Sequence, residues 1–310
     1  MKKVKVHPES LRGKVDRYIV DAITRQLSNN HVLIDTFWMT VDDPEIALLD
    51  DTKIAICYSG IDWENTGCIE ARLEAHRLIN SMSASQIHIG NTNNEYFFSY
   101  WVEFIRQNPN NYFNESYTQV PNIEKLFLSY NRRGHQHRKF LLSLIDEHGL
   151  EDSGIISRPD GKRIGEIEEY LDPLDDKIDM YSLGDATSWG KFLINVVTES
   201  TTYTNLFLSE KTWKPIIGLR PFLILGDENL YIKLKELEFD TFDDLFGTWW
   251  KDSQWENRAR SIVSILKHFE NDHTDLNKLY AKLLPRLQYN RENFKSLMIK
   301  NHNKICNLGL

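Results

Sequence analysis

The feature that most constrains the fold of this sequence is a repeated alternation of short apolar runs with segments of helical periodicity. In the first half the apolar runs are residues 31–35, 53–58 and 86–89, and the last two end at glycine-containing turns. Between them, residues 66–80 place apolar side chains at about 3.6-residue spacing, which is typical of an amphipathic helix. Strands separated by helices predict a parallel sheet covered by helices, so we expect an α/β fold.

A second series of apolar runs follows a polar, turn-rich segment at residues 108–122, which contains two prolines and is the predicted link between domains. A chain of 310 residues is longer than a single hydrophobic core usually organises. We therefore predict two domains, residues 1–120 and residues 121–310, the second of which ends in amphipathic helices. Its predicted strands are residues 125–130, 192–197 and 221–225, and its predicted helices are residues 137–148, 209–218 and 228–237.

The charge balance and the hydropathy pattern argue against several classes of protein, among them nucleic-acid binders and membrane-spanning proteins. Lys and Arg number 37 and Asp and Glu 45, a net charge of −8, whereas a sequence-independent nucleic-acid binder normally carries a basic surplus. No apolar run approaches the ~20 residues of a membrane span, and no apolar stretch follows the basic N-terminal residues as a signal peptide requires. The three cysteines are widely spaced and odd in number, which indicates reduced thiols and predicts a cytoplasmic protein.

The most informative polar segment follows the predicted strand at residues 192–197. This strand delivers Glu199 to its carboxyl end, which is where open α/β sheets bind ligands. Ser209 is suited to cap the next helix, whose free N–H groups would attract a diphosphate. Pro215 has no N–H to donate, so we expect that helix to be kinked or to begin later than Ser209.

Three residues directly after Ser209 could complete a nucleotide site. Lys211 and Thr212 would add a cation and a hydroxyl to the anion site, and Glu210 could accept hydrogen bonds from ribose hydroxyls. An alternative interpretation stays open, because Glu210 and Lys211 are also ordinary surface charges for a first helical turn.

A basic segment follows the predicted strand at residues 125–130 and opens the next predicted helix. Residues 131–139 read N-R-R-G-H-Q-H-R-K, and arginine forks match phosphate oxygens in a bidentate manner. A solvated run of charges is the competing interpretation. His135 and His137 have no further ligands at metal spacing, so a zinc site here has little support. The candidate phosphate-binding arginines are Arg132, Arg133 and Arg138.

Together these two segments resemble a family of phage and bacterial glycosyltransferase-like proteins related to the α1,3-fucosyltransferases. The resemblance covers roughly residues 125–245 and is most specific at residues 209–216, S-E-K-T-W-K-P-I. It implies a GT-B fold, in which two Rossmann-like domains face a cleft and the C-terminal domain holds the nucleotide sugar. The match of the first half to this family is one of architecture only.

The resemblance also implies roles for single residues. Arg132, Arg133 and Arg138 would hold the diphosphate. Glu199 would lie near the sugar, Glu210 near the ribose and Lys211 near the phosphates. Ser209, Thr212 and Lys214 complete the expected donor-binding set. The pair Lys214-Pro215 departs from the fucosyltransferase pattern, so the identity of the sugar is left open.

The sequence further predicts a transfer that needs no metal and no cofactor apart from the nucleotide-sugar donor. Metal-dependent transferases commonly hold a divalent ion through an Asp-x-Asp motif, and the sequence contains none. Arginine, lysine and a helix N-terminus would then neutralise the leaving diphosphate. An inverting transfer also needs a carboxylate that takes the proton of the acceptor. We expect it in the N-terminal half, at Asp62 or Asp35, with Glu95 as a third candidate.

The predicted function is therefore transfer of a sugar from a nucleoside-diphosphate sugar to an acceptor hydroxyl, and the oligomeric state is left open. The acceptor is either a surface glycan or, given the phage-like resemblance, a hydroxymethylated base in phage DNA, with the host cytoplasm as the location. A non-catalytic module that binds a nucleotide or a glycan is the alternative. A hydrolase has less support, because neither G-x-S-x-G nor G-x-x-x-x-G-K-[ST] is present.

Overall fold

The computed structural model describes residues 31–35, 54–58 and 88–89, and residues 101–307 with internal gaps. The gaps are residues 103–104, 107–108, 118–121, 132–133, 160–162, 165–181, 185, 201 and 203–207. The chain divides into two compact units, a larger one at Asn108–Ser296 and a smaller one formed by Met1–Gln107 with Leu297–Leu310. The domain limits predicted from the sequence stay a prediction.

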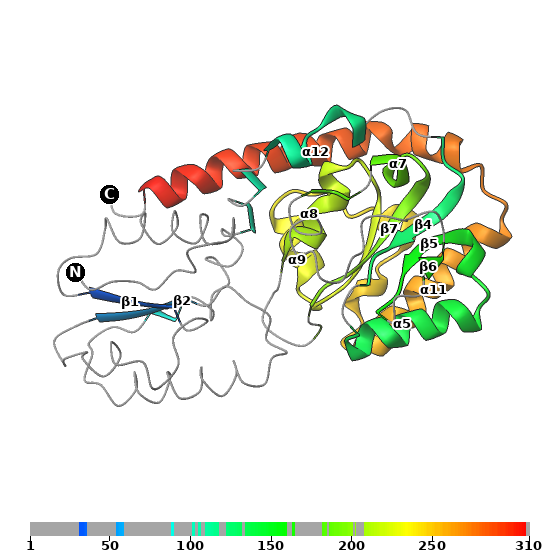
Figure 1. The fold of residues 1–310 in the computed structure, drawn as a ribbon, viewed down its shortest axis with the longest axis horizontal. Helices are drawn as coiled ribbons and strands as arrows, with labels where there is room; N and C mark the ends of the chain where they lie inside the picture. Colours follow the sequence, from blue (N-terminus) through cyan, green and yellow to red (C-terminus); the bar gives the residue numbers. More distant parts are fainter. Residues whose placement is uncertain are drawn as a thin grey trace. The chain divides into compact units, whose positions relative to one another are not determined.

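In the smaller unit the structure describes a parallel three-stranded sheet with the order β1-β2-β3. Strand β1 spans His31–Asp35, β2 spans Ile54–Tyr58 and β3 spans His88–Ile89 (Figure 1). The first two strands confirm the predicted runs, and β3 lies within the predicted run 86–89, of which residues 86–87 fall outside the described residues. The predicted helix at residues 66–80 lies outside the described residues.

The larger unit contains a five-stranded sheet with the order β6-β5-β4-β7-β8. All neighbours in it are parallel except β5 and β6, which run antiparallel. This sheet, with its helices, confirms the predicted α/β class. The strands are β4 (Lys125–Ser129), β5 (Gly154–Ser157), β6 (Arg163–Ile164), β7 (Phe192–Thr198) and β8 (Phe222–Leu225).

The direction of winding reverses beside β4. From β4 the chain passes to β5 on one side, and it later returns to form β7 on the other side of β4 and then β8 beyond it. Parallel sheets that reverse in this way bind ligands outside the carboxyl ends of the two strands at the reversal. The ends of β4 and β7 are therefore the expected binding edge of this sheet.

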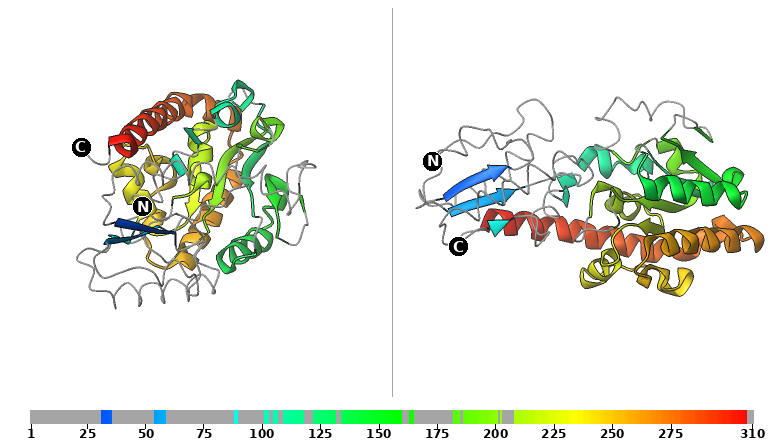
Figure 2. Two further views of the ribbon diagram at one scale, coloured as in Figure 1. Left: turned by 60° about the vertical axis from the view of Figure 1, so that its left-hand side comes forward. Right: turned by 90° about the horizontal axis from the view of Figure 1, so that it is seen from below.

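Two sets of helices cover the sheet. Helix α5 (Gln136–Glu147) packs on α11 (Trp255–Asn271), where the rings of Phe140 and Trp255 meet edge to face with centroids 5.4 Å apart. Helix α8 (Glu210–Ile217) contacts β7 and β8. Right-handed crossovers that run in opposite directions across a sheet put α5 and α8 on opposite faces. Figures 1 and 2 show α5 and α11 lying together.

The ends of the helices agree closely with the sequence. Helix α5 ends at Glu147, and its C-cap His148 is followed by Gly149 with φ 63°. The Leu150 N–H bonds to Ile145 O at 3.0 Å, so the predicted glycine stop is confirmed. Helix α8 begins directly after Ser209 and contains Pro215, so of the two alternatives expected from Pro215 the later start is wrong.

The remaining helical elements are short, apart from the last. Helix α12 spans Leu276–Asn307, and its residues up to Ser296 belong to the larger unit. Among the helices of the described ranges, none is both long and apolar enough to cross a membrane. The short helices are α4 (Pro109–Tyr112), α7 (Ala186–Trp189), α9 (Leu230–Glu236) and α10 (Asp243–Phe246), and the 3-10 turns are η1 (Glu115–Tyr117), η2 (Glu151–Ser153) and η3 (Trp249–Lys251).

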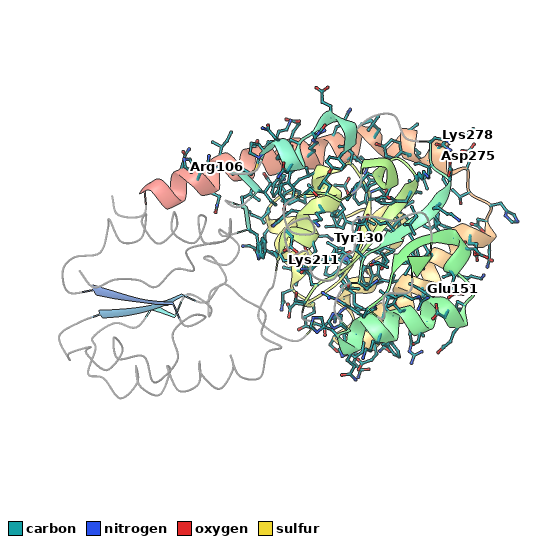
Figure 3. The ribbon with its side chains drawn as sticks, in the orientation of Figure 1. Arg106, Tyr130, Glu151, Lys211, Asp275 and Lys278 are labelled. Atoms are coloured by element: carbon teal, nitrogen blue, oxygen red, sulfur yellow. The ribbon has the colours of Figure 1, made fainter. Side chains whose placement is uncertain are left out.

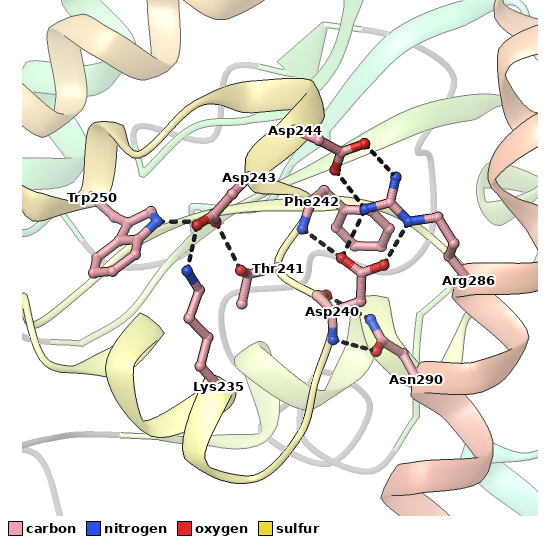
Figure 4. Close-up of polar contacts among 9 residues, drawn as sticks. All are labelled: Lys235, Asp240, Thr241, Phe242, Asp243, Asp244, Trp250, Arg286 and Asn290. Atoms are coloured by element: carbon pink, nitrogen blue, oxygen red, sulfur yellow. Dashed lines mark hydrogen bonds and ion pairs between the residues drawn. The ribbon is translucent and has the colours of Figure 1, made fainter.

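An ionic cluster fastens α12 to the start of α10 (Figure 4). The Arg286 guanidinium donates to Asp240 at 2.5 and 2.8 Å and to Asp244 at 2.6 and 3.0 Å. It also lies 5.0 Å from the ring centroid of Phe242, whose φ of 58° is left-handed. Asn290 pairs with the main chain of Asp240 through both side-chain amide atoms, at 2.8 Å each. The cluster thus holds a turn that a non-glycine residue adopts at a cost of about 1–2 kcal/mol.

Candidate functional site

One buried amide joins the carboxyl ends of three strands. The Asn131 side-chain oxygen accepts from the Thr198 hydroxyl at 3.0 Å, and its amide nitrogen donates to the Ser129 hydroxyl at 3.0 Å. Its main-chain N–H donates to the Ser157 hydroxyl at 2.8 Å. All four residues are buried, so β4, β5 and β7 end at one buried, hydrogen-bonded polar junction.

The first turn of α5 packs onto the end of β7. Nε2 of His137 lies 2.8 Å from the Glu199 carbonyl oxygen, and Nη2 of Arg138 donates to the carbonyls of Thr198 and Glu199 at 3.2 Å each. A carbonyl only accepts, so the neutral His137 ring carries its hydrogen on Nε2. His135 stacks on His137 with ring centroids 5.8 Å apart. The described part of the basic segment therefore supports the end of β7.

Burial, together with the nearby charges of Arg138 and His135, lowers the pKa of His137 from 6.5 to about 4. The hydrogen bond to Glu199 opposes this shift. The His137 ring is therefore neutral near pH 7.

We expect this depressed pKa to make the protein less stable in mild acid. The unfolded chain binds a proton at His137 below pH 6.5, whereas the folded chain does so only near pH 4. The stability contributed by neutral His137 is thus fully present above pH 6.5 and is lost as the pH falls toward 4, by up to about 3 kcal/mol. Urea unfolding at pH 7, 6 and 5 tests this. The free energy of unfolding of the wild type should exceed that of His137→Gln by less and less as the pH falls. The same replacement at the exposed His268 is the control for the loss of a histidine side chain as such.

On its other side, the end of β7 is bound to α8 through Glu199. Oε1 of Glu199 accepts from the Ser209 N–H at 3.1 Å and from the Thr212 hydroxyl at 2.5 Å, and Oε2 accepts from the Ser209 hydroxyl at 2.6 Å. Burial raises the pKa of this carboxyl, while Lys211 and the two hydroxyl donors oppose the rise. Ser209 also accepts from the Lys211 N–H at 3.3 Å, which confirms it as the N-cap of α8.

Glu210 and Lys211 form the outer part of the site. Nζ of Lys211 lies 2.8 Å from Oε1 of Glu210, and the side chains are 29% and 3% exposed, respectively. Lys211 is therefore a partly accessible cation beside a buried carboxylate; Figure 3 labels it together with Tyr130, the residue after β4. Oε2 of Glu210 is buried and has no hydrogen-bond partner within the described part of the chain. Buried polar atoms of this kind require an explanation.

A buried arginine that the sequence analysis missed closes the end of β8. Arg258 of α11 donates to the Gly226 carbonyl at 2.8 Å and to the Asp252 carbonyl at 2.6 Å. A side chain on Gly226 would begin 3.4 Å from the Glu199 side chain, so β7 and β8 end close together. Arg258 precedes the apolar Ile262 by four residues, and a cation on an apolar helix face is the signal that could have identified it.

The structure brings together six of the predicted donor-site residues, where β7 ends and α8 begins. Lys214 is buried in the last turn of α8. Arg132 and Arg133, and the candidate bases Asp62 and Glu95, lie outside the described residues. Asp35 is the last residue of β1, paired in register with Tyr58. The six are Arg138, Glu199, Ser209, Glu210, Lys211 and Thr212.

Comparison with known proteins gives no match to any protein-family model, curated protein or solved structure. Within the described ranges, no three His, Cys, Asp or Glu side chains are grouped so that they could hold a metal ion. The case for a function therefore depends on the residues of this chain and on their geometry.

Proposed function

We propose that this protein is an inverting, metal-independent glycosyltransferase of the GT-B type, and that the larger unit binds its nucleoside-diphosphate sugar. The observation that carries the proposal is the meeting of two distant segments at one sheet edge. The segment after β4 and the segment after β7 both contact Thr198 or Glu199, beside the reversal of the sheet. That edge is where an open α/β sheet binds a nucleotide.

The pairing of a buried acceptor with a partly exposed cation fits a nucleoside diphosphate. A ribose hydroxyl donating to Oε2 of Glu210 would satisfy an atom whose burial without a donor costs about 1–3 kcal/mol. The Lys211 ammonium, next to it, would then face the phosphates. Because the Ser209 N–H and hydroxyl already bind Glu199, we assign the phosphates to Lys211 together with Arg132 and Arg133.

In the proposed reaction an acceptor hydroxyl oxygen attacks the anomeric carbon as the bond to the nucleoside diphosphate breaks. A carboxylate of the N-terminal half, Asp62, Asp35 or Glu95, takes the hydroxyl proton. Lysine and arginine stabilise the negative charge on the departing diphosphate. Within this proposal the two units correspond to the two Rossmann-like domains of a GT-B enzyme. The proposal also places the protein among the fucosyltransferase-like glycosyltransferases that its sequence resembles. A glycan or a hydroxymethylated DNA base serves as the acceptor.

Isothermal titration with GDP, UDP, ADP, CDP and dTDP tests the binding part of this proposal. We expect one of these nucleotides to bind to the wild type. Hydrolysis of the matching nucleotide sugars then tests catalysis. Binding without turnover for any donor, with glycan and hydroxymethylated-DNA acceptors present, would favour the non-catalytic module. Absence of binding to all five nucleotides would refute the donor site.

A further inference from the structure

The Glu199 side chain is fully enclosed by donors of its own chain. Its exposed fraction is 0%, and both carboxylate oxygens accept hydrogen bonds from Ser209 or Thr212. Gly226 at the end of β8 lies beside this side chain, since a methyl group there would be in van der Waals contact, at 3.4 Å, with Cβ and Cγ of Glu199. A sugar could reach this carboxylate only by displacing the cap of α8.

The main chain of the same residue binds the opposite helix. Its carbonyl accepts from His137 and Arg138 of α5. Glu199 thus holds α8 by its side chain and α5 by its backbone, and the two sets of bonds are chemically separable. A substitution of the side chain alters the first set and leaves the second set in place.

We propose that Glu199 is a positioning residue, which fixes the N-terminal turn of α8 at the end of β7 and so places Glu210 and Lys211, without touching the ligand itself. This assignment replaces the expected contact of Glu199 with the sugar. Its effect on ligand affinity rests on the proposed nucleotide site, whereas its effect on α8 does not.

The first turn of α8 takes acceptors for its N–H groups from Glu199 and from a hydroxyl that Glu199 binds. The first N–H groups of any helix lack intrahelical partners. In α8 the Ser209 N–H bonds to Glu199, and the Lys211 N–H bonds to the Ser209 hydroxyl that Glu199 orients. Pro215 also removes the N–H that would bond to the Lys211 carbonyl, so this short helix has one intrahelical bond fewer at the same end.

Hydrogen exchange followed by mass spectrometry tests the placement of α8 without any ligand. In Glu199→Gln and in Thr212→Val, peptides that cover residues 208–213 should exchange at least about tenfold faster than in the wild type, because each variant removes an acceptor or donor of this cap. Peptides of α5 should keep the wild-type rate, because their bonds go to the main chain of Glu199. Glu270→Gln, which alters a partly buried carboxylate on α11, is the matched control and should change neither region. Equal acceleration in α5 and α8, or none in residues 208–213, would overturn the proposal.

Titration with the nucleotide that binds to the wild type tests the consequence for the site. A displaced Lys211 should weaken binding of that nucleotide about 10- to 100-fold in Glu199→Gln, since small misplacements of binding groups are costly. The double variant Glu199→Gln/Thr212→Val should lose less binding free energy for the nucleotide than the sum of the two single losses, because both substitutions affect the same hydrogen bond. Unchanged affinity in folded Glu199→Gln would also overturn the proposal. If the wild type binds no nucleotide, the donor site is wrong and hydrogen exchange alone decides whether Glu199 positions α8.

Discussion

Replacing Lys211 by alanine is expected to reduce sugar transfer by about 100- to 1000-fold, the effect of removing one group that stabilises transition-state charge. Lys211 is the partly exposed cation at the start of α8, and its ammonium lies 2.8 Å from the buried Glu210 carboxylate. Its loss leaves that carboxylate without its donor, at a cost of about 1–3 kcal/mol. A domain normally has about 5–15 kcal/mol of stability, so the variant should remain folded.

Turnover with the donor identified by titration measures this prediction, together with the unfolding free energy of each variant. Lys233→Ala is the matched control, because Lys233 is a partly exposed lysine on α9 that also pairs with a glutamate, the exposed Glu236. Lys211→Arg should retain part of the activity, since it keeps the charge. Undiminished turnover in Lys211→Ala would remove the proposed mechanism, whatever the structure of the variant.

Most strands of this protein could be predicted because their signal is local, whereas the short β5 and β6 were not predicted. A parallel sheet covered on both faces buries every residue of its inner strands, and β7 is accordingly a continuous buried run, Phe192–Thr198. The residues that end α5 and begin α8, Gly149 and Ser209, are equally local signals. The order of the strands is not a local property. Nothing in the sequences of β4 and β7 shows that they are neighbours and that β5 lies on the far side.

The sequence predicted which residues form the site, but not which of them are hydrogen-bonded to one another. The sequence placed Glu199 at the end of a strand and Ser209 at the start of a helix, ten residues apart, and both placements are confirmed. It did not show that the carboxylate would turn back onto the helix, because that contact depends on how β7 and α8 pack. Asn131 was equally hidden, since each of its partners comes from a different strand end.

The packing of α8 itself leads to a second large expected effect, at Gly218. This residue was predicted only as the end of a helix, and its φ of −83° is one that any residue adopts. A Cβ at Gly218 would lie 2.3 Å from Cζ3 of Trp189 and 2.6 Å from Cε3. Trp189 is fully buried, donates from Nε1 to the Leu183 carbonyl at 2.6 Å and meets the Phe192 ring at 5.2 Å. The ring therefore has no direction in which to yield.

We expect Gly218→Ala to lower the free energy of unfolding by about 3 kcal/mol, because a methyl group forced into a filled core displaces a large ring. Gly149→Ala is the contrasting variant: that site has open space around it but a φ of 63°, so only the backbone cost of about 1–2 kcal/mol applies. Trp189→Leu should itself be destabilising. The double variant Gly218→Ala/Trp189→Leu should nevertheless lose less unfolding free energy than the sum of the two single losses, since the smaller side chain makes room for the methyl group. Denaturant unfolding of the four variants measures this coupling. A smaller loss in Gly218→Ala than in Gly149→Ala would show that Trp189 does not limit the space beneath the end of α8.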